Sequence, residues 1–137
     1  MPAIQGILES ALYVADLDRA EAFYTGLFGF RRLLADERLR ALAVAEKHVL
    51  LLFKKGGSAD GEATPGGKIP GHDAAGQQHL AFSIDRSDVE AWQALLTEKS
   101  VPIESHVRPE QGGHSLYFRD PDGHLIELVT PGVWAIH

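Results

Sequence analysis

The sequence predicts an α+β protein made of two consecutive βαβββ modules, and three observations lead to this prediction. Strand and helix patterns follow one another in the order βαβββ, loop, βαβββ. The helical segments of the two halves match each other, VADLDRAEAFY in the first and IDRSDVEAWQ in the second. The halves also end alike, on HVLLLF and HLIELV. At 137 residues we therefore expect a single domain over residues 1–137 that contains an internal repeat.

The first module is expected over about residues 5–54 and opens with a strand at residues 7–14. Asp16 and Asp18 are both N-cap candidates for the helix that follows, and Asp18 with Glu21 fits a capping box. The apolar face of this helix holds Ala20, Phe23, Tyr24 and Leu27, and Gly29 ends it. Three further strands are expected at residues 30–34, 39–45 and 48–53.

The two modules are joined by a glycine-rich segment, residues 55–76, which holds seven glycines and two prolines and almost no large apolar residue. We expect a loop without regular secondary structure here. Loops of this length in a compact domain are uncommon and usually functional or disordered. A plain linker and a lid over a substrate site are equally compatible with this composition, and both interpretations stay open.

The second module is expected over residues 77–131. A strand at residues 77–84 precedes a helix whose start carries a capping box, Ser87 with Glu90. Further strands are expected at 102–107, 115–119 and 124–130, the last two joined by the turn residues Asp-Pro-Asp-Gly at 120–123. His124 is expected near the surface of this turn. Arg119 is expected to form a salt bridge of the hairpin rather than to clamp an anionic substrate.

Three polar residues lie in apolar strands at matching points of the repeat. Glu127 sits among Leu and Val residues, where a carboxylate is costly unless it is paired, protonated or bound to a metal. Aligning the halves places Glu9 opposite His79, and Leu51, which cannot ligate, opposite Glu127. One imidazole and two carboxylates suit a divalent metal with open positions, with Mn, Mg, Ni or Zn favoured and Fe(II) open. The plainer alternatives are a hydrogen-bonded His–Glu pair and a Glu9 side chain that points to water.

Composition excludes several classes of function. The net charge of −6 argues against nucleic acid or an anionic membrane as the partner. No cysteine is present, which excludes thiol nucleophiles, cysteine-zinc sites and disulfides. The sequence shows neither a secretory signal nor an apolar run long enough to span a bilayer. We therefore expect a cytoplasmic location and a small molecule as the substrate.

Three segments resemble the vicinal oxygen chelate superfamily, which includes glyoxalases, bleomycin resistance proteins and extradiol dioxygenases: LYVADLDRAEAFYTGLFGF, HLAFSI and SLYFRDPDGHLIEL. The resemblance implies that the modules form a curved, eight-stranded, half-barrel-like cavity. It implies that His79 and Glu127 are metal ligands. Glu9 falls where many members have His or Gln, and Leu51 falls where two members, glyoxalase I and methylmalonyl-CoA epimerase, have a fourth ligand. The resemblance also implies a homodimer. In such a dimer, Glu9 would bind the metal ion either of its own subunit or of the other subunit.

The function that these residues indicate is a metal-dependent enzyme acting as a Lewis acid on a small, oxygen-chelating substrate. A lyase, a transferase of the fosfomycin-resistance type and a dioxygenase stay open. Glu9 or Glu127 would serve as a general base. Strand alternation puts Ser115 and Tyr117 on one face, so Tyr117 is expected either to offer its hydroxyl to the cavity or to be a core aromatic. The alternative function is a metal-free protein of the bleomycin-resistance type that sequesters a drug or metabolite.

Overall fold

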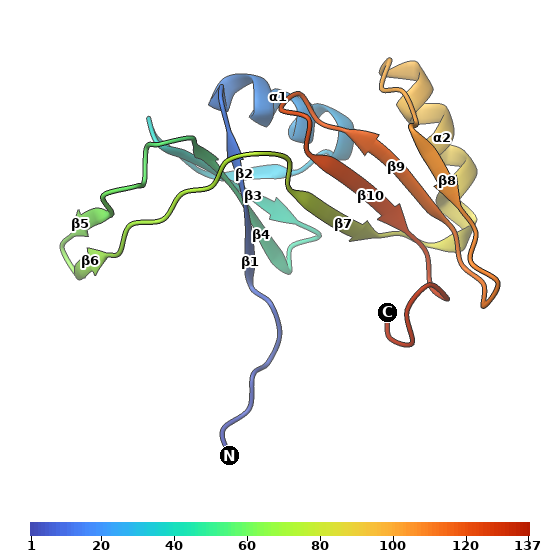
Figure 1. Cartoon of the computed structure of the whole chain (residues 1–137), viewed down its shortest axis with the longest axis horizontal. Coiled ribbons are helices and arrows are strands. Elements are labelled where there is room, and N and C mark those ends of the chain that lie inside the picture. The colour runs from blue at the N-terminus through green and yellow to red at the C-terminus, as the bar shows by residue number, and fades with distance from the viewer. The chain divides into compact units, whose positions relative to one another are not determined.

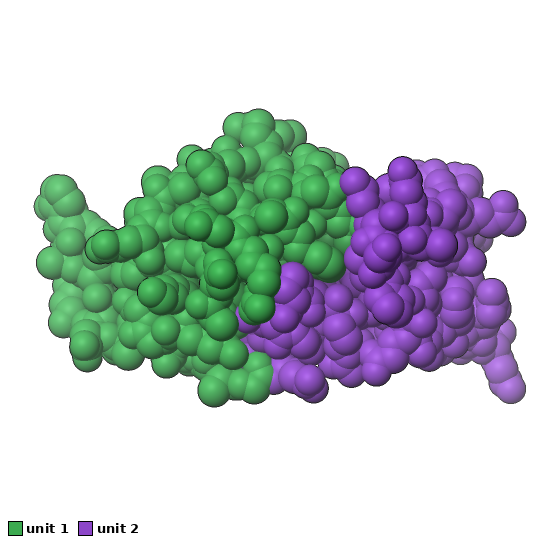
Figure 2. All heavy atoms as spheres, turned by 90° about the horizontal axis from the view of Figure 1, so that it is seen from above, with its two compact units in different colours: residues 1–76 green, residues 77–137 purple.

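The computed structural model describes all 137 residues and divides them into two compact units, Met1–Gly76 and Gln77–His137 (Figures 1 and 2). Each unit holds one α-helix and one four-stranded sheet. This confirms the predicted pair of βαβββ modules. Neither helix has the length and apolar character needed to cross a membrane.

Unit 1 contains a mixed four-stranded sheet covered by a helix, and a separate two-stranded sheet. Its elements are β1 (Glu9–Val14), α1 (Leu17–Phe28), β2 (Arg31–Ala35), β3 (Leu39–Val44), β4 (His48–Lys54), β5 (Glu62–Thr64) and β6 (Gly67–Ile69). The sheet order is β1-β4-β3-β2, with β1 and β4 parallel and the other pairs antiparallel. Alternate residues of the strands face the helix and are almost fully buried: Leu12, Val14, Leu42, Leu50 and Leu52. Ala20 and Tyr24 of α1 are completely buried as well.

The first helix is capped at both ends, although not by the predicted capping box. Asp16 is the N-cap, and its carboxylate accepts a hydrogen bond of 3.1 Å from the Arg19 amide. Gly29 ends the helix in the left-handed conformation, with φ at 69°. The prediction that Asp18 and Glu21 cap each other is wrong. Glu21 is instead bound by two arginines of the sheet, partners that lie too far along the chain for a local pattern to indicate.

Glu21 accepts two hydrogen bonds of 2.6 Å from Arg32 and a further one of 3.2 Å from Arg40. The hydrogen bonds from Arg32 lower the pKa of the Glu21 carboxyl group, and burial opposes them. Replacing Glu21 by Gln is expected to lower the free energy of unfolding at pH 7 by about 2 kcal/mol. A lowered pKa stabilises the fold above the unfolded pKa of about 4.3, and this stabilisation is lost as the pH falls through the folded value.

Urea unfolding of wild type and Glu21→Gln, at pH 7 and at a series of acidic pH values, checks this prediction. The two stabilities should differ at pH 7 and converge in acid. The matched control is Glu46→Gln, because Glu46 pairs with Arg31 on an exposed surface and should matter much less. A difference that stays constant down to acid pH would contradict the proposed origin of the effect.

The glycine-rich segment 55–76 is not the structureless loop that its composition predicts. It contains the antiparallel hairpin of β5 and β6. Arg38, which directly precedes β3, holds it by donating hydrogen bonds to the buried Ser58 hydroxyl at 2.6 Å and to the Glu62 carboxylate. The Gly56 amide also donates to Asp73 at 3.1 Å. One side chain from outside the segment and hydrogen bonds within it therefore supply the order that its glycines do not.

Unit 2 repeats the same arrangement. Its elements are β7 (His79–Ser83), a 3₁₀ turn (Arg86–Asp88), α2 (Val89–Glu98), β8 (Ser105–Val107), β9 (Ser115–Arg119) and β10 (Leu125–Val129). The sheet order is β7-β10-β9-β8, with β7 and β10 parallel. The core of this unit consists of fully buried apolar side chains: Leu96, Leu116, Phe118, Ile126 and Leu128. The predicted capping box at Ser87 and Glu90 is wrong, because the 3₁₀ turn leads into α2 with Asp88 as its N-cap residue.

The hairpin turn before β10 shows a second difference from expectation. The Asp120 carboxylate accepts hydrogen bonds of 2.9 Å from the amides of Asp122 and His124, which closes the turn. His124 is fully buried rather than near the surface, and its Nδ1 accepts a hydrogen bond of 2.9 Å from the Gln78 amide. Arg119 forms the expected salt bridge, 2.8 Å from Glu104.

The strand registers confirm how the halves of the sequence align. Glu9 pairs with Val49 in unit 1, and His79 pairs with Leu125 in unit 2. Leu51 and Glu127 each lie two residues further along the partner strand. Glu9 is therefore the counterpart of His79, and Leu51 is the counterpart of Glu127.

Candidate metal centre

Three adjacent strands of unit 2 bring four polar side chains to one face of its sheet. His79 begins β7, Glu127 lies in the middle of β10, and Tyr117 on β9 pairs directly with Glu127. Ser115 is two residues from Tyr117 and shares its face. The residues between them, Leu116 and Phe118, are fully buried in the core. The predicted alternation of polar and apolar faces on β9 is thus present.

The His79 ring is oriented by the backbone of the neighbouring strand. Its Nδ1 lies 2.9 Å from the Leu125 carbonyl oxygen, which can only accept a hydrogen bond. The proton of a neutral ring is therefore on Nδ1, and Nε2 carries a lone pair. Nε2 lies 3.2 Å from Oε1 of Glu127. This arrangement is compatible with a histidine ligand, whose other nitrogen usually donates to a carbonyl or carboxylate.

Glu127 is 7% exposed, and its carboxylate has a second partner besides His79. The Ser115 hydroxyl donates a hydrogen bond of 2.6 Å to Oε2. Oε1 is left facing Nε2 of His79. Two acceptor atoms at this distance repel each other unless a cation, either a proton or a metal ion, lies between them. Imidazole nitrogen with carboxylate oxygen is a donor set that fits a divalent metal ion.

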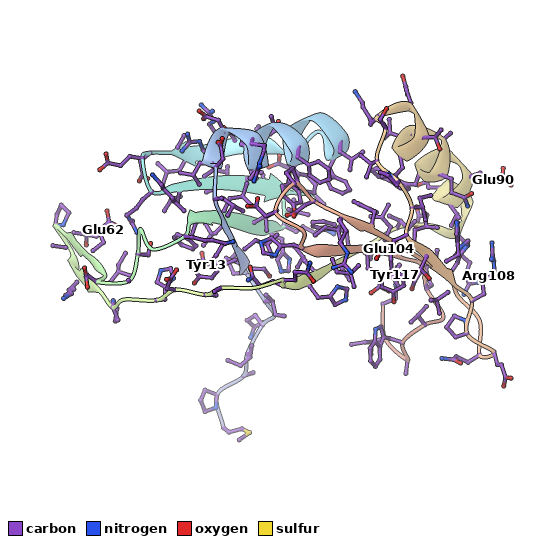
Figure 3. All side chains as sticks on the ribbon, turned by 45° about the horizontal axis from the view of Figure 1, so that its top comes forward. Tyr13, Glu62, Glu90, Glu104, Arg108 and Tyr117 are labelled. Atoms are coloured by element: carbon purple, nitrogen blue, oxygen red, sulfur yellow. The ribbon has the colours of Figure 1, made fainter.

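Tyr117, labelled in Figure 3, lies beside this pair because it pairs with Glu127 across β9 and β10. Its ring centroid is 6.3 Å from that of His79, with 29° between the ring planes. Burial raises the pKa of the Tyr117 phenol, and the negative charge of Glu127 raises it further. The phenol is therefore protonated at neutral pH and can donate a hydrogen bond.

Of the three predicted ligands, the structure gathers His79 and Glu127. Glu9 belongs to unit 1, where it is exposed at the start of β1. No group of three or more potential ligands is close enough together to hold a metal ion. The part of Glu9 as a third ligand remains a prediction.

Sequence reasoning missed a polar pair in unit 1. The Tyr13 hydroxyl lies 2.6 Å from Nδ1 of His72, and the ring of Phe53 packs edge-on against His72 at 4.6 Å. Burial raises the pKa of Tyr13, and the charge of Asp73 adds to this. Tyr13 shares a face of β1 with Glu9. No spacing signal marks His72, because it reaches the strand from the segment after β6.

The fold and the His79–Glu127 pair define a protein with two βαβββ modules whose second sheet brings an imidazole and a carboxylate together. Residues 6–128 match the family model described as the Glyoxalase/Bleomycin resistance protein/Dioxygenase superfamily, and the chain belongs to this superfamily.

Known relatives within the superfamily have different activities. The crystal structure of lactoylglutathione lyase from Agrobacterium tumefaciens is 34% identical, with a TM-score of 0.89 over 98% of this chain and 100% of that one. Metallothiol transferase FosB from Shouchella clausii is 28% identical over 129 residues, 93% of this chain and 81% of that protein. Catechol-2,3-dioxygenase from Bacillus subtilis is 30% identical over 87% of this chain but only 39% of its own length.

Proposed function

We propose that the protein is a metal-dependent enzyme that acts on a small substrate with two neighbouring oxygen atoms. The facing pair of acceptors, Nε2 of His79 and Oε1 of Glu127 at 3.2 Å, carries this proposal. At this distance the pair needs a cation between its two atoms, and a divalent metal ion can fill that place. Likeness to a metallothiol transferase over most of the chain supports the proposal independently.

His79 and Glu127 would hold the metal, and Glu9 is proposed as a third ligand, supplied by the same chain or by a second subunit. Mn, Mg, Ni or Zn is favoured over Fe(II), because carboxylate oxygens make the donor set hard. When bound, such an ion supplies Lewis-acid polarisation of a substrate oxygen. The Leu125 carbonyl and the Ser115 hydroxyl keep both ligands oriented, which is the usual part of outer-shell groups.

The remaining chemistry falls to side chains next to the pair. Tyr117 would donate a hydrogen bond to the substrate oxygen on which negative charge develops. Glu127 has one oxygen occupied by Ser115, so it would act through Oε1, either as a ligand or as the proton acceptor. The protein is expected to act in the cytoplasm and as a homodimer, the latter measurable by light scattering of the eluted protein.

The first candidate reaction is transfer of a thiol to a small epoxide, on the likeness to FosB. The sulfur forms a bond to an epoxide carbon, the carbon–oxygen bond breaks, and the oxygen takes the proton that the thiol loses. The second candidate is isomerisation of a thiol adduct, which the likeness to lactoylglutathione lyase favours. Leu51 argues against this reaction. It occupies the position in unit 1 that corresponds to Glu127, and its side chain cannot supply the fourth metal ligand that glyoxalase I has there.

Metal-loaded protein tests these candidates against one panel: fosfomycin with cysteine or glutathione, the glutathione adduct of methylglyoxal, and catechol with oxygen. We expect turnover of one of the three, dependent on the added ion. Metal-independent, tight binding of bleomycin without any turnover would instead support a sequestering protein.

Replacing Tyr117 by Phe is expected to lower kcat by about 10- to 1,000-fold while metal affinity stays unchanged, because only the hydroxyl is lost. The comparison of kcat with the dissociation constant of the ion, measured on the same preparation, checks this. Tyr13→Phe is the matched control for loss of a phenol in the other unit. Unchanged turnover in Tyr117→Phe would mean that the ring serves packing alone.

A further inference from the structure

A groove of about 520 Å³ lies in unit 2, and none of the candidate metal-centre residues lines it. Its walls come from the start of α2, from the segment between β8 and β9, and from the residue after β10. The polar side chains among its lining residues are Arg86, Ser87, Glu90, Gln93, Arg108, His114 and Thr130. Figure 3 shows Glu90 on α2 and Arg108 beyond the end of β8 at the same side of this unit.

The two arginines of the groove differ from most arginines of the chain. Five others form ion pairs with carboxylates: Arg31, Arg32, Arg38, Arg40 and Arg119. Arg86 and Arg108 form none, although the chain carries a net charge of −6 and has carboxylates to spare. Two guanidinium groups without an ion-pair partner thus line the same groove, which also holds the Glu90 carboxylate.

Both arginines are placed to act on a bound group. Arg86 is held by the Pro131 carbonyl oxygen, which lies 3.1 Å from Nη2 and 3.4 Å from Nε, so its orientation is fixed before a ligand arrives. Arg108 lies close enough to His114 to influence it: burial lowers the pKa of the His114 imidazole, and the charge of Arg108 lowers it further. The positive charge of Arg108, which disfavours protonation of His114, attracts an anion to the same place.

We propose that this groove binds an oxyanion, the phosphate or carboxylate group of a small molecule. Guanidinium groups match the oxygen spacing of both groups and donate in pairs. The Ser87 hydroxyl of the 3₁₀ turn and the Gln93 amide of α2 add neutral donors. Glu90 faces the same groove with a negative charge, and it holds the affinity for a simple anion low.

This site is independent of the proposed enzyme function, because it shares no residue with the metal centre. An inactive or metal-free protein would still bind the anion, and loss of anion binding would leave the metal centre as it is. The two proposals can therefore fail separately.

The test is a titration of the full chain with inorganic phosphate and, in a second arm, with malonate, followed by NMR at constant ionic strength. We expect saturable binding of at least one of these anions, with shifts centred on the start of α2 and on His114. Arg108→Gln should weaken binding about tenfold, because a charged donor is lost while no bond within the protein is broken. Glu90→Gln should tighten it severalfold.

The matched control is Arg119→Gln, which removes an arginine of the same unit that is already paired with Glu104. Its affinity should equal that of wild type. Arg86→Gln gives a second reading of the site, with circular dichroism as a check that the unit stays folded. Absence of saturable binding to the folded wild type would overturn the proposal. So would an affinity that Arg108→Gln leaves unchanged or that Arg119→Gln lowers equally.

Discussion

Replacing Glu127 by Gln is expected to weaken divalent metal binding by about a hundredfold or more, while the fold remains intact. Gln has the same shape but no charge, and an amide is a poor ligand for a metal that prefers carboxylate oxygen. The amide oxygen can still accept the hydrogen bond from Ser115. The amide nitrogen can donate to Nε2 of His79, which now lies 3.2 Å from a carboxylate oxygen.

The unfolding temperature of Glu127→Gln, with and without metal, gives a second test of this prediction. Without metal, Glu127→Gln should unfold at the same temperature as wild type or a higher one, because the amide can donate a hydrogen bond to Nε2 of His79 without a cation between them. With metal added, wild type should be stabilised and the variant should not. Glu104→Gln serves as the control, since it removes an exposed carboxylate paired with Arg119 in the same unit. If Glu127→Gln binds the metal ion as tightly as wild type, Glu127 is not a metal ligand.

The second large effect is expected in the turn that precedes β10. His124→Ala should lower the free energy of unfolding by about 3 kcal/mol. The fully buried ring would leave a cavity, and the Gln78 amide would lose its acceptor. Because Gln78 directly precedes His79, the variant should also weaken metal binding. Urea unfolding measures the loss, with the exposed His137→Ala as control, and equal stability of both variants would show that His124 is dispensable.

The sequence was sufficient to predict the fold and to single out His79 and Glu127, which the structure brings within 3.2 Å of each other. The repeat predicted two βαβββ modules, and the strand registers confirm that Glu9 and His79 are counterparts. A carboxylate inside an apolar strand singled out Glu127, because burial of a charge demands a partner. Alternation on β9 correctly placed Ser115 and Tyr117 on one face. All of these inferences use local periodicity or the repeat, which a single sequence contains.

The errors arise where the partner is distant in the sequence. The sequence pattern predicted that Glu21 caps the first helix. In the structure its carboxylate is instead bound by Arg32 and Arg40 of the sheet. His124 read as a surface turn residue, but folding of the hairpin turns its ring inward to the Gln78 amide. The hairpin in residues 55–76 depends on Arg38, which lies outside that segment. Tertiary contacts thus override local preference in each case.

The central claim is that His79 and Glu127 bind a divalent metal ion. The most direct measurement is anomalous diffraction from crystals of the protein supplied in turn with Mn, Ni and Zn, together with elemental analysis of the same preparation. The account predicts one ion per chain, bonded to Nε2 of His79 and to a carboxylate oxygen of Glu127. Crystals in which no ion occupies this place at saturating metal, with His79 and Glu127 joined directly by a hydrogen bond, would contradict it.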